Sequence, residues 1–305
     1  DMIGGYDRYI YGEMFDSIAD ARNEGESLQA MLFLMDGKEY GYFIWQIAIS
    51  FITSNRYVFI LITVVFIYFL YFIAFRKYIS NYPLACIVFL GFFYYFTMTY
   101  LRQVIAVGIA WQGIQYIWKR KPIQFFFFVA IAASFHNSAL LFSIMYFIPT
   151  KKFSQSSIVL FLLLCLFVGT SRFPNMLVSY AGDISNKKSL YGEELQGFRI
   201  EYIFEVLFLI IITFSHYRKI DKSPQTLTFL NMTYFLCAIL LFFMRFEQGG
   251  RFAWPFLMGV TYILTNIADM KRTETWVKPT VIIVCFALFV RITLSLIHIS
   301  EPTRR

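Results

Sequence analysis

The stretch YVFILITVVFIYFLYFIAF, at Tyr57–Phe75, has no charged side chain along its whole length. A helix that crosses the hydrocarbon core of a bilayer needs about 20 consecutive apolar residues. The basic pair Arg76-Lys77 follows the stretch directly, as expected where a helix leaves the membrane. Residues 57–75 therefore predict a membrane-spanning helix.

Comparable apolar runs recur along the rest of the chain. Pro83, Pro122, Pro149 and Pro224 mark predicted helix ends, because proline fits the first turn of a helix but not its interior. The sequence predicts an all-α, polytopic integral membrane helical bundle of about 8–10 membrane segments. Beside Tyr57–Phe75, the runs are Tyr82–Met98, Arg102–Trp118, Ile158–Thr170, Ile200–His216, Thr226–Met244, Phe252–Ala268 and the segment from Trp276 onward.

The composition supports a membrane protein. The 305 residues are 58% hydrophobic and only 15% charged, whereas about a quarter of the residues of a soluble domain are charged. The 37 Phe and 21 Tyr exceed what one water-soluble core of this size can bury, but they suit helices in contact with lipid. We therefore predict one membrane domain.

The net charge of +8 raises the question of nucleic-acid binding. The basic residues gather in short clusters between apolar runs, which is the pattern of cytoplasmic loops and not of a phosphate-binding stripe. We predict no nucleic-acid partner, and the four separated cysteines predict no disulfide, metal site or cofactor. The clusters are Arg76-Lys77, Lys119-Arg120-Lys121, Lys151-Lys152, Arg218-Lys219 and Lys271-Arg272, and the cysteines are Cys86, Cys165, Cys237 and Cys285.

The apolar run Ile123–Ile148 is too long for one untilted span and is interrupted near its middle by Ser134-Phe135-His136-Asn137-Ser138. If it crosses the membrane once, the three later basic clusters lie outside, against the positive-inside bias. If it forms a broken or re-entrant hairpin around His136, all five clusters lie in the cytoplasm. The sequence therefore favours the hairpin, whose irregular backbone must be buried in protein or line a wet cavity.

This topology predicts three regions. Residues 1–40 form an extracytoplasmic segment, and residues 41–293 form the transmembrane domain. Within that domain, Phe43–Thr53 is predicted to be a short interfacial helix, and residues 171–199 are predicted to form an inserted outer loop. Residues 294–305 include LSLIHISEPTR, which resembles a translated sequencing adapter, so we expect an adapter-derived tail. Because the chain begins at Asp1, we expect a segment to be missing upstream.

Three arginines near the predicted outer face are candidates for phosphate binding. Arg102 begins an apolar run, and Arg245 and Arg251 flank a short polar connection. Arginine near the apolar zone is costly, and its planar fork makes bidentate contacts with phosphate oxygens. The alternative is that these arginines extend to lipid headgroups without a function in catalysis.

His136 is the candidate acid or base, because a histidine deep in an apolar run is costly and imidazole titrates near neutral pH. The alternative is a structural histidine that hydrogen-bonds across the helix break. Glu201 and Glu205 share one helix face and have a structural explanation at a helix start. We expect His216 to be only a cytoplasmic flank.

An ordered set of short motifs resembles the EpsG-like exopolysaccharide biosynthesis proteins, which are relatives of Wzy-type polysaccharide polymerases. Each motif alone is weak, but their order from Gly5 to Phe252 is fairly specific. The motifs are Gly5-Tyr6-Asp7 with Tyr11 and Phe15, Glu39-Tyr40-Gly41-Tyr42, Tyr100-Leu101-Arg102-Gln103-Val104-Ile105-Ala106, Phe135-His136-Asn137-Ser138-Ala139 and Gly250-Arg251-Phe252.

The resemblance implies a multi-pass enzyme of the bacterial inner (cytoplasmic) membrane that polymerises lipid-linked repeat units into an exopolysaccharide or capsular polysaccharide. It implies glycosyl transfer from an undecaprenyl-diphosphate-linked oligosaccharide at the outer face without a metal, with other polysaccharide-synthesis membrane proteins as candidate partners. Arg102, His136 and Arg251 would be catalytic, the arginines at the departing diphosphate and His136 at the acceptor hydroxyl. Asp7, Tyr11, Glu39, Gln103, Ser138 and Arg245 would bind substrate.

Three other functions stay open at the level of sequence. A lipid-linked-sugar glycosyltransferase would use an acidic pair in the first outer segment, often with a divalent metal. A flippase or transporter of lipid-linked glycans would show inverted repeats and charged residues at the membrane midplane. A non-catalytic scaffold of a synthesis complex would have no essential polar residue.

Overall fold

The computed structural model describes residues 5–27, 39–184, 197–246, 248–270 and 273–300, with no side-chain description at 5–8, 181–184 and 295–300. All regular elements in these ranges are helices. The chain forms two compact units. Unit 1 comprises Asp1–Tyr116, Lys121–Ser143 and Lys278–Arg305, and unit 2 comprises Ile117–Arg120 and Ile144–Val277. The fold is therefore all-α, as the apolar runs predict.

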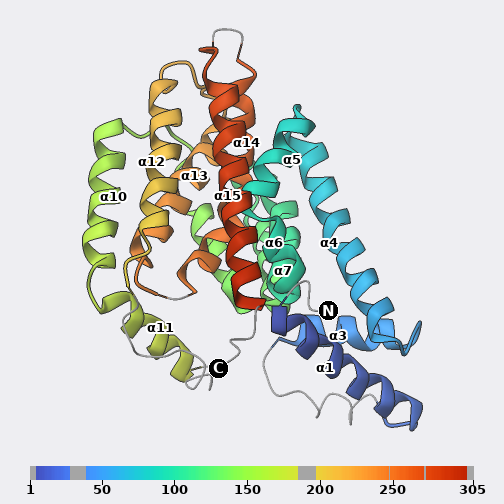
Figure 1. Cartoon of the computed structure of the whole chain (residues 1–305). Helices are drawn as coiled ribbons and strands as arrows, with labels where there is room; N and C mark the ends of the chain where they lie inside the picture. The colour runs from blue at the N-terminus through green and yellow to red at the C-terminus, as the bar shows by residue number, and fades with distance from the viewer. Residues whose placement is uncertain (1–4, 28–38, 185–196, 247, 271–272, 301–305) are drawn as a thin grey trace. The chain divides into compact units, whose positions relative to one another are not determined.

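Unit 1 is organised around α7, which packs against α4, α6 and α9 (Figure 1). Helices α1 and α3 pack against each other and against α4, and α3 also packs against α9. Three helices cross the boundary between the units: α8 (Gln115–Trp118) and η1 (Asn137–Tyr146) begin in unit 1 and end in unit 2, and α15 (Val277–Ser300) lies in unit 1 except for its first residue. The helices that lie wholly in unit 1 are α1 (Gly5–Asn23), α3 (Tyr40–Ser50), α4 (Arg56–Tyr78), α5 (Tyr82–Phe92), α6 (Tyr94–Thr99), α7 (Leu101–Gly113) and α9 (Pro122–Phe135).

Helix α4 shows how the sequence builds these elements. It begins where the Asn55 side chain accepts hydrogen bonds from the N–H groups of Tyr57 and Val58, which lack helical partners. One face is buried in unit 1, whereas the opposite face exposes apolar side chains at helical spacing. A long exposed apolar stripe is expected where a helix meets lipid. That stripe comprises Leu61, Val65, Phe69 and Phe72.

Unit 2 is organised around α13, which packs against α10, α12, α14 and η3. Two glycines allow backbones to approach closely, because a Cβ on Gly169 would lie 2.0 Å from the Leu241 carbonyl oxygen and one on Gly259 2.7 Å from that of Phe229. The helices of unit 2 are α10 (Gln155–Gly169), α11 (Phe173–Ile184), α12 (Ile200–Ser215), α13 (Pro224–Phe242), η3 (Gly249–Phe256) and α14 (Leu257–Ala268).

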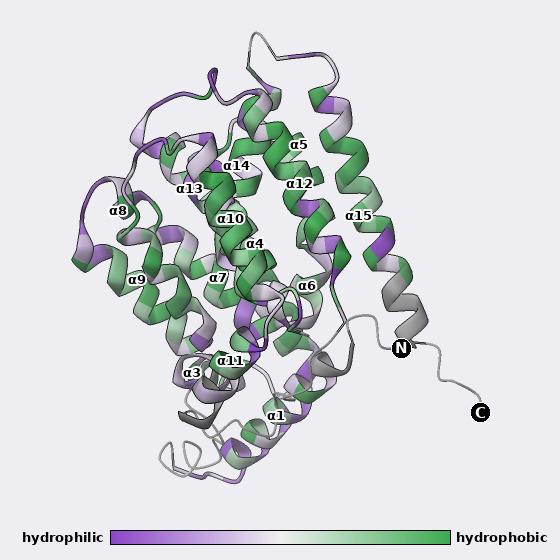
Figure 2. Ribbon diagram, turned by 90° about the vertical axis from the view of Figure 1, so that its left-hand side faces the viewer, coloured by the Kyte–Doolittle hydropathy of each residue, from purple (hydrophilic) through white to green (hydrophobic). Residues whose placement is uncertain are grey.

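The lengths and composition of the helices identify a multi-pass membrane protein. In the described ranges, three helices are long and apolar enough to cross a bilayer alone, namely α4, α13 and α15. Helices α10 and α11 make a fourth such segment if the pair, bent by 74°, is taken as one. Figure 2 shows α10 hydrophobic along most of its length, with hydrophilic residues concentrated in the loops. Other predicted spans are divided into shorter helices, so the total of about 8–10 segments stays a prediction.

The segment around His136 turns back on itself. Helix α9 ends at Phe135, His136 is extended (φ −158°, ψ 124°), and η1 begins at Asn137. Two contacts join positions on opposite sides of this break: the Phe125 and Phe142 rings lie 5.8 Å apart in unit 1, and Arg120 Nη1 donates to the Tyr146 carbonyl (3.0 Å) in unit 2. The hairpin expected from the basic clusters is therefore present, and its break lies at His136.

The polar segments differ from the sequence expectation in one respect. Residues 1–40 contain α1, a helix that the apolar pattern does not reveal because it is polar on average. Helix α3 covers most of the predicted short helix Phe43–Thr53, and α11 lies in the predicted loop 171–199, of which 185–196 fall outside the described residues. Helix α15 continues through Ser300 into the predicted tail.

Candidate functional site

Glu39 and Arg102 form an ion pair in unit 1. Glu39 precedes α3 and is only 6% exposed, whereas the side chain of Arg102, in the first turn of α7, is 34% exposed. Arg102 Nη1 donates to Glu39 Oε2 at 2.6 Å across 63 residues of sequence. The guanidinium also lies over the Tyr11 ring of α1, 5.5 Å from its centroid. Three elements thus fix the orientation of Arg102.

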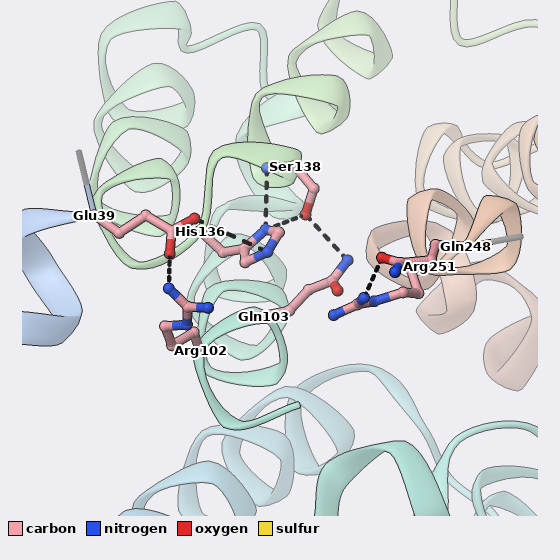
Figure 3. A network of polar contacts seen from close by, with 7 residues as sticks. All are labelled: Glu39, Arg102, Gln103, His136, Ser138, Gln248 and Arg251. Atoms are coloured by element: carbon pink, nitrogen blue, oxygen red, sulfur yellow. Dashed lines mark hydrogen bonds and ion pairs between the residues drawn. The ribbon is translucent and has the colours of Figure 1, made fainter. Parts of the chain in front are cut away.

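His136 lies on the other side of the same carboxylate (Figure 3). Its Nδ1 accepts from the Ser138 backbone N–H at 3.2 Å and lies 2.7 Å from Ser138 Oγ. Because a backbone N–H can only donate, Nδ1 is an acceptor and the proton of the neutral ring is on Nε2. That Nε2 faces Glu39 Oε1 at 3.9 Å, which is too long for a hydrogen bond.

Gln103 completes this set, which we call the His136 centre: Glu39, Arg102, Gln103, His136 and Ser138. Gln103 is buried, and its Nε2 donates to Ser138 Oγ at 3.1 Å. The donors therefore point in one direction, from Gln103 through Ser138 to Nδ1 of His136. This arrangement fixes both the position and the tautomer of the imidazole.

Close packing keeps α3 near this centre. A Cβ on Gly41 would lie 2.2 Å from Ser134 Oγ and 3.0 Å from the Ser134 carbonyl carbon. Only glycine therefore allows α3 to approach the end of α9 this closely. The contact determines where Glu39, two residues earlier, meets Arg102 and His136.

The structure thus brings together six predicted site residues of unit 1: Tyr11, Glu39, Arg102, Gln103, His136 and Ser138. Asp7 lies in α1, among the residues whose side chains are not described. Sequence reasoning gave no role to Tyr42, which lies in one of the motifs, and did not select Gln46; both are buried in α3. Their spacing after Glu39, at i+3 and i+7, marks one helix face and could have identified them.

The other two predicted arginines belong to unit 2. Arg251, in η3, donates through Nη1 to the Gln248 side-chain oxygen (Figure 3) and lies over the Trp254 ring at 5.9 Å. Arg245 Nη1 donates to the Thr170 carbonyl at 3.2 Å, and its guanidinium lies over the Phe198 ring at 4.8 Å. Their joint action with Arg102 stays a prediction.

Two residues that sequence reasoning did not select lie beside these arginines. The Arg199 N–H donates to the Met244 carbonyl at 3.2 Å, and the Tyr202 hydroxyl accepts from the Gly250 N–H at 3.0 Å. A Cβ on Gly250 would lie 2.6 Å from that hydroxyl, so a larger residue there would require the Tyr202 side chain to shift. Arg199 and Tyr202 are distant in sequence from residues 244–251, so the sequence gave no sign of these contacts. Their one signal in the sequence was their position beside Glu201, at the start of a predicted helix.

The opposite end of unit 2 contains a second charged cluster. His216 is fully buried and pairs through Nε2 with Glu274, which also accepts from Lys219 Nζ at 2.8 Å. The hydrogen bond from Lys219, the backbone N–H of Glu274 and the nearby His216 lower the pKa of the Glu274 carboxyl to about 2. His216 is therefore more than the flank we expected, because it ties the end of α12 to the chain before α15.

Among the described residues, no group of three or more His, Cys, Asp or Glu side chains is arranged to hold a metal ion. Glu39 and Glu274 are instead carboxylates paired with cations. Arg102 supplies the positive charge that the buried Glu39 carboxylate requires when it leaves water.

Comparisons with known proteins agree with this architecture. The search of curated proteins and the search of solved structures each find no match. A family model described as EpsG family matches residues 3–302, which is nearly the whole chain. The chain therefore belongs to the EpsG family and is a multi-pass membrane protein of exopolysaccharide biosynthesis.

Proposed function

We propose that this protein is a polysaccharide polymerase of the bacterial inner membrane. It transfers a growing glycan from its polyprenyl diphosphate to a hydroxyl of another lipid-linked repeat unit. The observation that carries the proposal is the His136 centre, where a half-buried arginine, a buried carboxylate and an oriented imidazole meet in an apolar bundle. Family membership supports the same pathway.

Arg102 is the group that binds the diphosphate. Its Nη1 is engaged by Glu39, and its Nε has no acceptor among the described residues. A guanidinium has five N–H donors, so a phosphate can bind while Glu39 remains bound. Positive charge positioned where the leaving diphosphate gains charge stabilises the transition state by a few kcal/mol, about 10²–10³ in rate.

Glu39 and His136 act together on the acceptor hydroxyl. Their facing atoms are 3.9 Å apart, so an oxygen about 2.8 Å from each can donate to Oε1 and accept from Nε2–H. In this arrangement Glu39 receives the hydroxyl proton as the acceptor oxygen attacks the sugar carbon. The bond from that carbon to the diphosphate oxygen breaks, and the electron pair leaves with the diphosphate. His136 orients the hydroxyl and serves as a donor, a revision of the base role that the sequence suggested.

The test is the lipid-linked glycan profile of a host that lacks the gene and is complemented with single variants. Arg102→Lys keeps the charge and the pairing with Glu39 but loses the fork. Glu39→Gln keeps the side-chain shape and an acceptor oxygen for Arg102 but removes the negative charge that can take up a proton. His136→Asn keeps a side-chain acceptor for the Ser138 N–H but removes Nε2. We expect each variant to reduce polymer at least 100-fold, since acid–base groups typically contribute 10²–10⁴. On a gel, the ladder of glycan chain lengths should collapse to a single repeat unit.

Arg22→Lys is the matched control, because Arg22, in α1, donates to the side chains of Asn23 and Ser54 and lies outside the His136 centre. It should give a wild-type ladder. A full ladder with Arg102→Lys would reject bidentate phosphate recognition, and a full ladder without the gene would reject the polymerase. Loss of even the single outward-facing unit would indicate a flippase or an earlier glycosyltransferase.

A further inference from the structure

Helix α11 turns sharply away from α10 within unit 2 (Figure 1). Only a short turn separates the two helices, and their axes are bent by 74°. The Ser171 hydroxyl accepts from the Phe173 N–H at 3.1 Å, which begins the new helix. At the same corner the Phe173 ring meets the Phe242 ring of α13 edge-on, with 6.3 Å between the centroids. The change of direction is therefore built into the fold of unit 2.

The faces of α11 are polarised in the opposite sense to those of a helix in water. The exposed side chains between residues 173 and 180 are all apolar or aromatic, are 46–67% exposed, and recur at i, i+3, i+4 and i+7: Phe173, Met176, Leu177 and Tyr180. The opposite face contains Asn175, which is buried, and Ser179, which is partly buried. An amphipathic helix in water turns its polar side outward and its apolar side to the core. The exposed face of α11 therefore suits an apolar environment.

This exposed face continues the apolar surface of α10. The most exposed apolar side chains of α10 have the same spacing and are 55–75% exposed: Leu160, Leu163, Leu164 and Phe167. In a membrane protein, such a surface along a helix faces the acyl chains of lipid. Only the turn at residues 170–172 separates the two surfaces, and it contains the exposed Arg172. Arginine and tyrosine are favoured at membrane interfaces, so Arg172 and Tyr180 suit the two ends of such a face.

Length and angle place α11 along the membrane surface and not across it. Helix α10, with 15 residues, is about 22 Å long, and α11, with 12 residues, is about 18 Å long. At 74° to α10, helix α11 advances only about 5 Å along the axis of α10. It therefore adds little to the crossing of a hydrocarbon core of about 30 Å. Even if α10 has the average tilt of spanning helices, about 20°, the axis of α11 lies closer to the membrane plane than to the membrane normal.

We propose that α11 is an in-plane helix at the membrane surface, and that its partner is the phospholipid of the leaflet where α10 ends. Its exposed apolar face lies among the upper parts of the acyl chains, and Arg172 lies at the headgroup phosphates. Because α10 begins shortly after the basic cluster Lys151-Lys152, the predicted topology makes this the outer leaflet. The segment expected to be an outer loop is thereby attached to the membrane, whether or not the protein is a polymerase.

The experiment measures the depth of single spin labels in the full chain, with its four native cysteines replaced, in vesicles of phosphatidylethanolamine and phosphatidylglycerol. Oxygen concentrates among the acyl chains and a neutral nickel chelate stays in water, so their relative collision rates with a label give its depth. Labels at Phe173→Cys, Met176→Cys and Tyr180→Cys should collide more with oxygen than with nickel. Their depths should agree within about 5 Å, one helical turn. Leu164→Cys in α10 is the control for lipid, and Glu24→Cys is the control for water.

Every other outcome would overturn the proposal. Nickel collisions at Met176→Cys as frequent as at Glu24→Cys would show a loop in water. A difference in depth of about 10 Å between Phe173→Cys and Tyr180→Cys, the rise of seven helical residues, would show that α11 continues the span. Exclusion of both reagents would show that protein covers this face. Leu177→Cys lies on the same face and replaces any of these variants that fails to fold.

Discussion

At the scale of individual residues, the ion pair between Arg102 and Glu39 makes each charge depend on the other. Arg102 and Glu39 exchange much of their hydration for each other, and Arg102 also gains the Tyr11 ring. Removing one partner of such a buried pair typically costs about 3–5 kcal/mol, because the other charge is left unpaired. Variants that keep charge or shape, such as Arg102→Lys and Glu39→Gln, therefore report chemistry better than alanine does.

Gln46 provides a prediction at the same scale. It is fully buried in α3, and neither of its amide atoms has a hydrogen-bond partner among the described residues. Since an unsatisfied buried polar group costs about 1–3 kcal/mol, Gln46→Leu should raise the thermal stability of the purified protein. Thermal unfolding in detergent measures this, with Gln155→Leu at an exposed site as control. A lower melting temperature would mean that the amide has a partner and would contradict the prediction.

Packing between whole helices determines the His136 centre as much as its side chains do. Helix α9 ends where His136 becomes extended, and α3 approaches that end through Gly41. The imidazole in turn accepts the Ser138 N–H at the start of η1, so one residue ends one helix and supports the next. The structural and catalytic readings of His136 are therefore compatible.

Gly41→Ala tests this packing. Its Cβ would overlap Ser134 Oγ and press on the Ser134 backbone, so α3 and α9 must separate. Overpacking of this kind typically costs about 1–3 kcal/mol. We expect a lower melting temperature together with a loss of polymer, because Glu39 moves with α3. Gly25→Ala is unsuitable as a control since its φ is +79°, whereas Gly197→Ala, with nothing within 4 Å of its Cβ, should behave as wild type. Unchanged activity in Gly41→Ala would show that Glu39 does not depend on this contact.

At the scale of the molecule, the hairpin carries the topology prediction. Its break lies at His136 and its two arms are in contact, so we expect the segment from Lys121 to Tyr146 to add no net crossing. The positive-inside bias then predicts that all five basic clusters face the cytoplasm. The same prediction assigns residues 1–40 and the starts of α7 and α12 to the outer side.

Cysteine labelling tests the topology. In a chain with its four native cysteines replaced, Glu24→Cys should react with a membrane-impermeant maleimide on intact cells, because this topology places the end of α1 outside. Lys151→Cys, at an exposed position, should react only after the membrane is opened. Reaction of Lys151→Cys on intact cells would show that the segment crosses once and would reverse every later helix.

The sequence by itself determined the class of structure, because the apolar runs, the prolines and the basic clusters act locally. It also located the break at His136 and the short motifs around Arg102. It could not tell which apolar side chains face lipid: Phe59 is buried and Phe69 exposed in the same helix, yet lipid and protein interior are equally apolar. Only the tertiary structure decided that Glu39 meets Arg102 and His136, and that the Arg199 N–H binds the Met244 carbonyl. These contacts depend on how helices pack across long stretches of chain, and that packing cannot be read from hydropathy.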